Sequence, residues 1–227
     1  MHQKLKYYLY ISETKINQLY SQIPQKLLRE IASELTIGLK PAGLGISATF
    51  KKEQVQETQF SRLQIVVQSL EKHMPKDIGS VDAPGVYFKG ILPMFWGSLP
   101  TWDNTRVVYF GGATQQTLLG LGGSAHHLIG QRGDLKVGEP SSDIPSLVAV
   151  LYKELQLKFP NLEYFFDENA TLDVIEVMAR QAKGTTQTLE FFAKRLAYDS
   201  GKPTPDRINP RQKSVLFGTP IYVALAD

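Results

Sequence analysis

Glycine is concentrated in the middle of the chain, where residues 85–138 hold 11 of the 18 glycines. The same stretch contains both tryptophans and two runs rich in aromatic and β-branched residues, 86–96 and 106–110. Such runs are typical of β-strands, and glycines among them supply turns or places where two backbones approach closely. We therefore expect the middle of the chain to form a sheet with short connections.

Apolar residues recur at helical spacing on both sides of this glycine-rich part, which predicts amphipathic helices there. The predicted helices cover residues 16–23, 25–35, 57–74, 144–155, 172–182 and 189–196. Further strands are predicted at 6–12, 35–39, 45–51, 114–119, 215–217 and 221–225. Because the sequence has no internal repeat and no long linker, residues 1–227 are expected to form a single α+β domain. Its sheet should be mixed or mainly antiparallel and covered by amphipathic helices.

The composition excludes several chemistries. The chain has no cysteine, which excludes disulfides, thiolate metal ligands and thiol nucleophiles. No apolar run is long enough to span a membrane, and the first residues lack the pattern of a signal peptide. A cytoplasmic protein without a membrane partner is therefore predicted.

Charge is unevenly distributed although its sum is small. The formal net charge of +3 is too low to indicate duplex nucleic acid as a partner. Residues 194–213 carry six basic and two acidic side chains in a proline-containing stretch. A solvated loop accounts for this run of charge.

The strongest candidate for a binding site is the segment 120–130, which we expect to be a glycine-rich loop. Gly122 and Gly123, with Gly120, would let the backbone approach a ligand, and Ser124 would cap a short helix whose amides bind anions. The spacing matches neither the P-loop nor the dinucleotide-binding motif. The alternative is that these glycines serve only a tight turn or a bulge.

His126 and His127 follow directly and are half of the four histidines. Imidazoles titrate near neutral pH, so either could act as a general acid or base beside a bound anion. Adjacent side chains point in different directions and no further ligand has suitable spacing, so no metal or other cofactor is predicted. The alternative is a structural role, with one ring hydrogen-bonded and the other exposed.

Other polar and aromatic residues are expected near this loop. A bound phosphate needs arginine or lysine in addition to backbone amides. The residues expected around the loop are Lys89, Arg106, Tyr109 and Arg132. Trp96 and Trp102 are candidates for stacking on a base, and the alternative for both is packing in the core.

Three motifs spread over the chain resemble an uncharacterised family of bacterial proteins. They are YLYIS at 8–12, LGGSAHHLIG at 121–130 and GTPIYVALA at 218–226. The resemblance implies a bacterial cytoplasmic protein of single-domain size. It assigns no reaction and no catalytic residue.

These features predict a protein that binds a small anionic ligand, with a nucleotide or a nucleotide-derived signal as the expected ligand. Two alternatives stay open. One is a metal-independent hydrolase of the phosphodiesterase type, in which His126 or His127 moves a proton. The other is a scaffold that binds another protein or a second copy of the chain. The sequence does not decide whether the protein is an enzyme.

Overall fold

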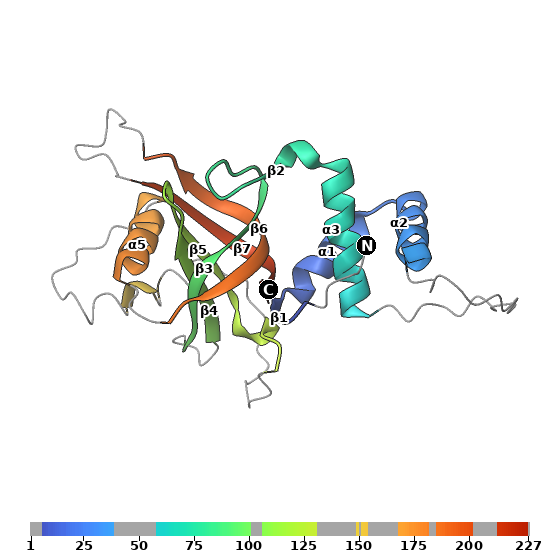
Figure 1. Cartoon of the computed structure of the whole chain (residues 1–227). Helices are drawn as coiled ribbons and strands as arrows, with labels where there is room; N and C mark the ends of the chain where they lie inside the picture. The colour runs from blue at the N-terminus through green and yellow to red at the C-terminus, as the bar shows by residue number, and fades with distance from the viewer. Residues whose placement is uncertain are drawn as a thin grey trace, which may run out of the picture. The chain divides into compact units, whose positions relative to one another are not determined.

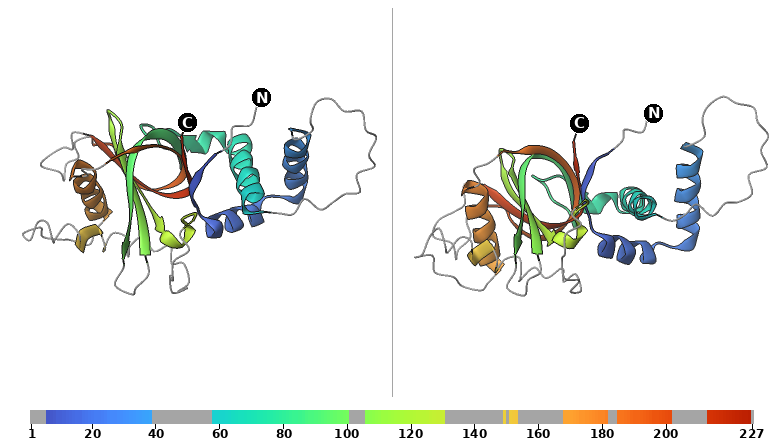
Figure 2. Two further views of the ribbon diagram at one scale, coloured as in Figure 1. Left: turned by 60° about the horizontal axis from the view of Figure 1, so that its bottom comes forward. Right: turned by 90° about the horizontal axis from the view of Figure 1, so that it is seen from below.

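The computed structural model describes residues 6–38, 58–100, 106–130, 149, 151–153, 168–181, 185–201 and 213–226. The chain divides into two compact units (Figures 1 and 2). The helical unit is Glu13–Lys76, and the barrel unit is Met1–Ser12 together with Asp77–Asp227. The α+β class is confirmed, whereas the organisation as a single domain stays a prediction.

The described residues of the helical unit form three α-helices, α1 (Glu13–Gln22), α2 (Gln25–Gly38) and α3 (Gln59–His73). Pro24 separates α1 from α2, because proline ends the preceding helix and is tolerated just before the next one. Thr58 begins α3 as its N-cap, and its hydroxyl accepts a hydrogen bond from the Ser61 amide at 3.2 Å. The strand predicted at 35–39 is wrong, since α2 continues to Gly38. The strand predicted at 45–51 lies outside the described residues.

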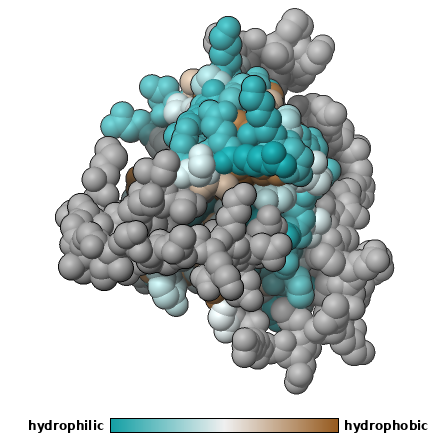
Figure 3. Space-filling view, turned by 90° about the vertical axis from the view of Figure 1, so that its right-hand side faces the viewer, coloured by the Kyte–Doolittle hydropathy of each residue, from teal (hydrophilic) through white to brown (hydrophobic). Residues whose placement is uncertain are grey.

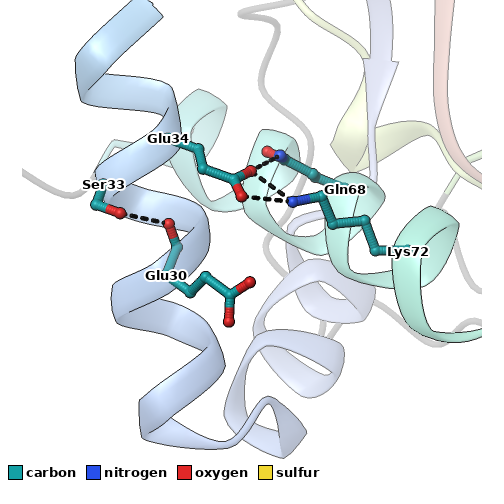
Figure 4. A network of polar contacts seen from close by, with 5 residues as sticks. All are labelled: Glu30, Ser33, Glu34, Gln68 and Lys72. Atoms are coloured by element: carbon teal, nitrogen blue, oxygen red, sulfur yellow. Dashed lines mark hydrogen bonds and ion pairs between the residues drawn. The ribbon is translucent and has the colours of Figure 1, made fainter.

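A polar network joins α2 to α3 (Figure 4). The Glu34 carboxylate accepts hydrogen bonds from Gln68 Nε2 at 2.8 Å and from Lys72 Nζ at 2.5 Å. Hydrophilic side chains also predominate among the coloured residues on the face that Figure 3 shows. The amphipathic helices of this unit thus keep ion pairs at the surface, while α3 buries Leu63, Val66 and Leu70.

The barrel unit contains seven strands in one sheet. They are β1 (Tyr8–Ile11), β2 (Ile78–Gly79), β3 (Tyr87–Pro100), β4 (Arg106–Ala113), β5 (Thr117–Ser124), β6 (Gln187–Asp199) and β7 (Ser214–Leu225). The strand predicted at 114–119 is confirmed only from Thr117, because Thr114 lies in the turn that leads from β4 into β5.

Five of the strands close into a ring in the order β3–β4–β5–β7–β6–β3 (Figure 2). The first part of β3 pairs with β6 and its second part pairs with β4, so one long strand serves both neighbours. The pair β5–β7 is parallel, and the other four pairs are antiparallel. Outside the ring, β1 adds to β7 and β2 adds to β3.

A five-stranded barrel with Greek-key connections is the architecture of OB-folds. Helix α5 (Glu168–Gln181) lies in the sequence between the third and fourth strands of the ring, β5 and β6. The ring of five strands therefore resembles an OB-fold barrel, with β1, β2 and the helical unit as additions to it.

Side chains alternate between the inside and the outside of the barrel, as the period of a strand requires. The inside is filled by large apolar side chains from all five ring strands. Examples are Phe88, Phe110, Leu119, Phe191 and Leu216, each fully buried. A core of this kind packs the interior of a small barrel and leaves ligands to its outer face or its ends.

Helix α5 covers the outer face of β4, β5 and β7. Its residues Leu172, Val174 and Ile175 form one cluster with Tyr109 of β4 and Leu118 of β5. This agrees with the helix predicted at 172–182. The helix predicted at 189–196 is wrong, because these residues lie in β6. Its apolar residues at 189, 192, 193 and 196 mimic helical spacing, although the strand buries Phe191, Phe192 and Ala193 in succession and exposes Lys194 and Arg195.

Candidate functional site

The segment predicted as a glycine-rich loop is mostly a strand. Gly120, Gly122 and Gly123 lie in β5, which pairs with β4 on one side and with β7 on the other. Their amides therefore belong to a sheet rather than to a loop around an anion. The loop prediction is wrong at these positions. Glycines occur not only in loops but also in strands, at places where another group approaches the backbone closely.

Aromatic side chains take the space that these glycines leave. A Cβ at Gly123 would lie 2.3 Å from the Tyr10 hydroxyl oxygen. A Cβ at Gly120 would lie 2.8 Å from Ile175 Cδ1 of α5 and 3.0 Å from the Tyr109 hydroxyl oxygen. Gly122 faces Tyr109 directly across the β4–β5 pair. The glycines thus allow two tyrosine rings to lie against the backbone of β5.

The two tyrosine hydroxyls are buried and have no hydrogen-bond partner among the described residues. Burial raises the pKa of both Tyr10 and Tyr109 well above the usual range. The Ser12 hydroxyl lies near that of Tyr10 and offsets part of this rise, without the geometry of a hydrogen bond. Both phenols therefore stay protonated and act as packing groups.

Ser124 and the histidines follow at the end of β5. Ser124 caps the short 3-10 helix η2 (Ala125–His127), and its hydroxyl accepts a hydrogen bond from the His126 amide at 3.3 Å. His127 is 8% exposed and its ring lies edge-on to that of Tyr10, with 5.7 Å between centroids. His126 is exposed, and its ring centroid is 5.7 Å from that of His127. The capping role is confirmed, and the catalytic role of the histidines stays a prediction.

Of the other predicted residues that the structure describes, Tyr109 lies next to β5 on the paired strand β4, whereas Lys89 lies on β3, which does not pair with β5. Lys89 lies on the outer face of β3 opposite Phe192 of β6, where its charge helps to lower the pKa of Glu190. Tyr109 lies on the outer face of β4 beneath α5. Arg132 and Trp102 lie outside the described residues. No group of three or more potential metal ligands occurs among the residues that the structure describes.

A different set of side chains comes together at one end of the barrel, which we call the Trp96 end. Trp96 of β3 stacks on Phe110 of β4, with 5.9 Å between centroids and 27° between planes. Its indole nitrogen donates a hydrogen bond to the Gln187 amide oxygen of β6 at 3.0 Å. These two contacts fix the ring, which nevertheless keeps 36% of its surface exposed.

Arg106 of β4 lies on the same side of the sheet. Its Nε donates to the Ser98 hydroxyl oxygen at 2.9 Å, and its Nη2 donates to the Ser98 carbonyl oxygen at 3.1 Å. Ser98 is two residues after Trp96 on β3, and side chains two residues apart lie on one face of a strand. The guanidinium of the exposed Arg106 is thereby bound to a residue on the same face of β3 as Trp96.

The Trp96 end also connects to the predicted histidines. Phe110 contacts Tyr10 edge-on, with 6.0 Å between ring centroids, and Tyr10 contacts His127 in the same manner. A continuous series of rings therefore runs from Trp96 through the barrel core to η2. This arrangement favours a rigid rather than a mobile end of the barrel.

The sequence pattern indicated Trp96 as a candidate for stacking on a base and Arg106 as a neighbour of the supposed loop, and it did not indicate Gln187. Arg106 could have been found from the sequence, because Trp96 and Ser98 lie two residues apart in β3 and the next strand, β4, begins with this arginine. Gln187 could not be found in this way, because residues 189–196 were predicted as a helix. Its pairing with β3 follows only from the closed ring.

The described basic residues of 194–213 are Lys194, Arg195 and Lys213, and they lie away from Trp96. Strand β6 begins beside Trp96 at Gln187 and runs away from it to Asp199. Lys213 lies at the other end of the barrel, where its Nζ donates to the Thr114 carbonyl oxygen at 2.8 Å. The described part of this stretch is thus separated from Trp96 by the length of the barrel.

Comparison with known proteins gives one match, to the model of a family described as "Family of unknown function (DUF7019)", over residues 6–227. No curated protein and no solved structure matches the chain. In the part of the chain that the structure describes, no helix combines the length and the apolar character needed to cross a membrane.

Proposed function

Because the chain belongs to DUF7019, a family of unknown function, we propose its function from the barrel itself: the Trp96 end binds a nucleotide. The base stacks on the indole of Trp96, and the guanidinium of Arg106 binds the phosphate. The observation that carries this proposal is that the two groups lie on one face, each held by its own hydrogen bonds.

The spacing of the two groups suits such a ligand. Arg106 reaches back to Ser98, which follows Trp96 by two residues, and two residues of a strand span about 7 Å. This length is comparable to the distance between the base and the 5′-phosphate of a nucleotide. A small ligand of this kind can therefore contact both groups at once.

Arg106 still has hydrogen-bond donors for a phosphate. A guanidinium carries five N–H groups, and contacts to Ser98 occupy one on Nε and one on Nη2. The two on Nη1 and the second on Nη2 have no hydrogen-bond partner among the described residues, and the contacts to Ser98 fix the orientation of the group. An ordered guanidinium loses less conformational entropy when it binds an anion.

The covered outer face favours a small ligand over a long single strand. OB-fold proteins that bind oligonucleotides use the outer face of their second and third strands, which here are β4 and β5. Helix α5 packs on Tyr109 and Leu118 of that face. This supports a mononucleotide.

The test is titration calorimetry of the full chain with adenosine, guanosine, inosine and uridine 5′-monophosphates, ribose 5-phosphate and inorganic phosphate. Arg106→Gln should weaken binding of the nucleotides about 10-fold or more, as expected for the loss of charged hydrogen bonds. The matched control is Arg195→Gln, another exposed arginine, whose Nη1 donates to the Pro84 carbonyl oxygen. Equal affinity of the Arg106→Gln variant, or no binding of any nucleotide, would refute the proposal.

The two other predicted functions, hydrolysis that uses His126 or His127 and a scaffold that binds a partner or a second copy, stay predictions. Cytoplasmic location stays a prediction as well. The hydrolase prediction needs a phosphodiester as substrate, such as a cyclic nucleotide, because a phosphodiesterase cleaves one ester bond of a diester and does not release phosphate from 5′-monophosphates. A diester that stays intact in the presence of the protein would favour binding alone.

A further inference from the structure

We infer that the Trp96 end distinguishes bases by Gln187, which favours a base that presents a carbonyl oxygen over one that presents an amino group at the same position. This inference rests on the proposed nucleotide site. It concerns a different residue and a different part of the ligand from the contact between Arg106 and the phosphate.

The orientation of the Gln187 amide is fixed by its partner. The indole N–H of Trp96 is a donor only, so it must face the amide oxygen, as it does at 3.0 Å. The Nε2 of Gln187 then points away from the indole nitrogen. Gln187 is exposed, and this amide group presents two N–H donors beside the ring on which the base would stack.

A glutamine whose side-chain oxygen already accepts a hydrogen bond selects a base differently from a glutamine whose amide has no partner. A free glutamine can bind adenine with donor and acceptor together, because adenine presents an acceptor nitrogen beside its amino group. At the Trp96 end the donors of Gln187 would meet the amino group of adenine, which is itself a donor. A carbonyl oxygen at the same position would instead accept a hydrogen bond.

The other polar groups of the site have the same character. Arg106 has only donors, and the Ser98 hydroxyl oxygen already accepts a hydrogen bond from it. The described polar groups around Trp96 therefore present mainly donors to a ligand. The matching ligand is rich in acceptors, with a phosphate at one end and a carbonyl-bearing base such as hypoxanthine, guanine or uracil at the other.

Inosine and adenosine 5′-monophosphate are the sharpest pair of probes, because their bases differ in carrying a carbonyl or an amino group at position 6. We expect inosine monophosphate to bind about 2- to 10-fold more tightly, the effect of one neutral hydrogen bond gained or lost. Gln187→Glu keeps an acceptor for the indole and removes the donors. It should abolish or reverse this preference.

The control is Thr188→Glu, which adds the same negative charge to the neighbouring position of β6, on its other face. This variant should leave the ratio of the two affinities unchanged, even if the charge weakens both. Equal affinities in the unaltered protein would overturn the role of Gln187, while sensitivity of both ligands to Arg106→Gln would still support the nucleotide site. A preference that persists in Gln187→Glu would also overturn it. Binding of neither ligand would refute the nucleotide site itself.

Discussion

Replacing Gly123 by alanine tests whether the glycines of β5 exist to make room for aromatic rings. The new Cβ would lie 2.3 Å from the Tyr10 hydroxyl oxygen and 3.0 Å from the ring carbon that bears it. Tyr10 is fully buried and contacts both Phe110 and His127, so its ring cannot move away freely. Forcing an extra methyl group into a packed interior costs about 1–3 kcal/mol.

This cost should appear as a lower midpoint of thermal unfolding, by about 2–4 °C for each kcal/mol in a chain of this size. The matched control is Gly97→Ala, because Gly97 lies in β3 and a Cβ there would meet no atom within 4 Å. The control should be neutral or slightly stabilising, since alanine restricts the unfolded chain. Circular dichroism at increasing temperature measures both variants.

A second substitution separates the hydroxyl from the rest of the ring. Tyr10→Phe removes the atom that would lie 2.3 Å from the new Cβ, and it removes a buried hydroxyl that has no partner among the described residues. Tyr10→Phe alone should therefore cost little, and the cost of Gly123→Ala should shrink by at least about 0.5 kcal/mol in its presence. If Gly123→Ala is as mild as Gly97→Ala, or if Tyr10→Phe brings no relief, the close approach is not what requires glycine.

Three further predictions concern stability and pH. Burial acts to raise the pKa of Glu190, but hydrogen bonds from Lys6 and Tyr222 and nearby positive charge outweigh it and lower the pKa. Stability should thus fall as the pH drops below about 5, towards and through the pKa of the folded state, and urea titrations of Glu190→Gln should show a shallower fall. Burial lowers the pKa of Lys15 to about 8, so the unfolded chain holds a proton that the folded protein lacks between about pH 8 and 10. Stability should rise over that interval, and the same titrations should find this rise reduced in Lys15→Met. Thr58→Ala should lower the free energy of unfolding by about 1 kcal/mol through loss of the N-cap of α3, whereas Thr58→Ser should retain most of it.

The sequence predicted those elements whose pattern depends on near neighbours. Strands β3 and β4 follow from runs of aromatic and β-branched residues, and α3 follows from apolar residues at helical spacing with Pro75 after its end. The cap by Ser124 is likewise local, because it depends on two successive residues. Such features are set by backbone sterics and short-range hydrogen bonds.

The elements that were mispredicted depend on residues distant in the sequence. Gly120 and Gly123 resemble loop glycines until the rings of Tyr109 and Tyr10 are placed against them. The run 189–196 resembles a helix until β3 and β7 are placed on its two sides. The sequence did not predict the Trp96 end for the same reason, because Gln187 contacts Trp96 only when the barrel closes.

The pairing of β1 with β7 has a consequence for how the protein folds. Tyr10 faces Val223, so the sheet joins residues near opposite ends of the sequence, with the whole helical unit between them. Contacts between residues so far apart in the sequence form slowly, because the long intervening chain must close into a loop before the strand pairing can stabilise that loop. On the ribosome, Tyr8–Ile11 must wait for Ser214–Leu225 before it can enter the sheet. The helical unit, whose contacts are local, has all of its residues long before the barrel does.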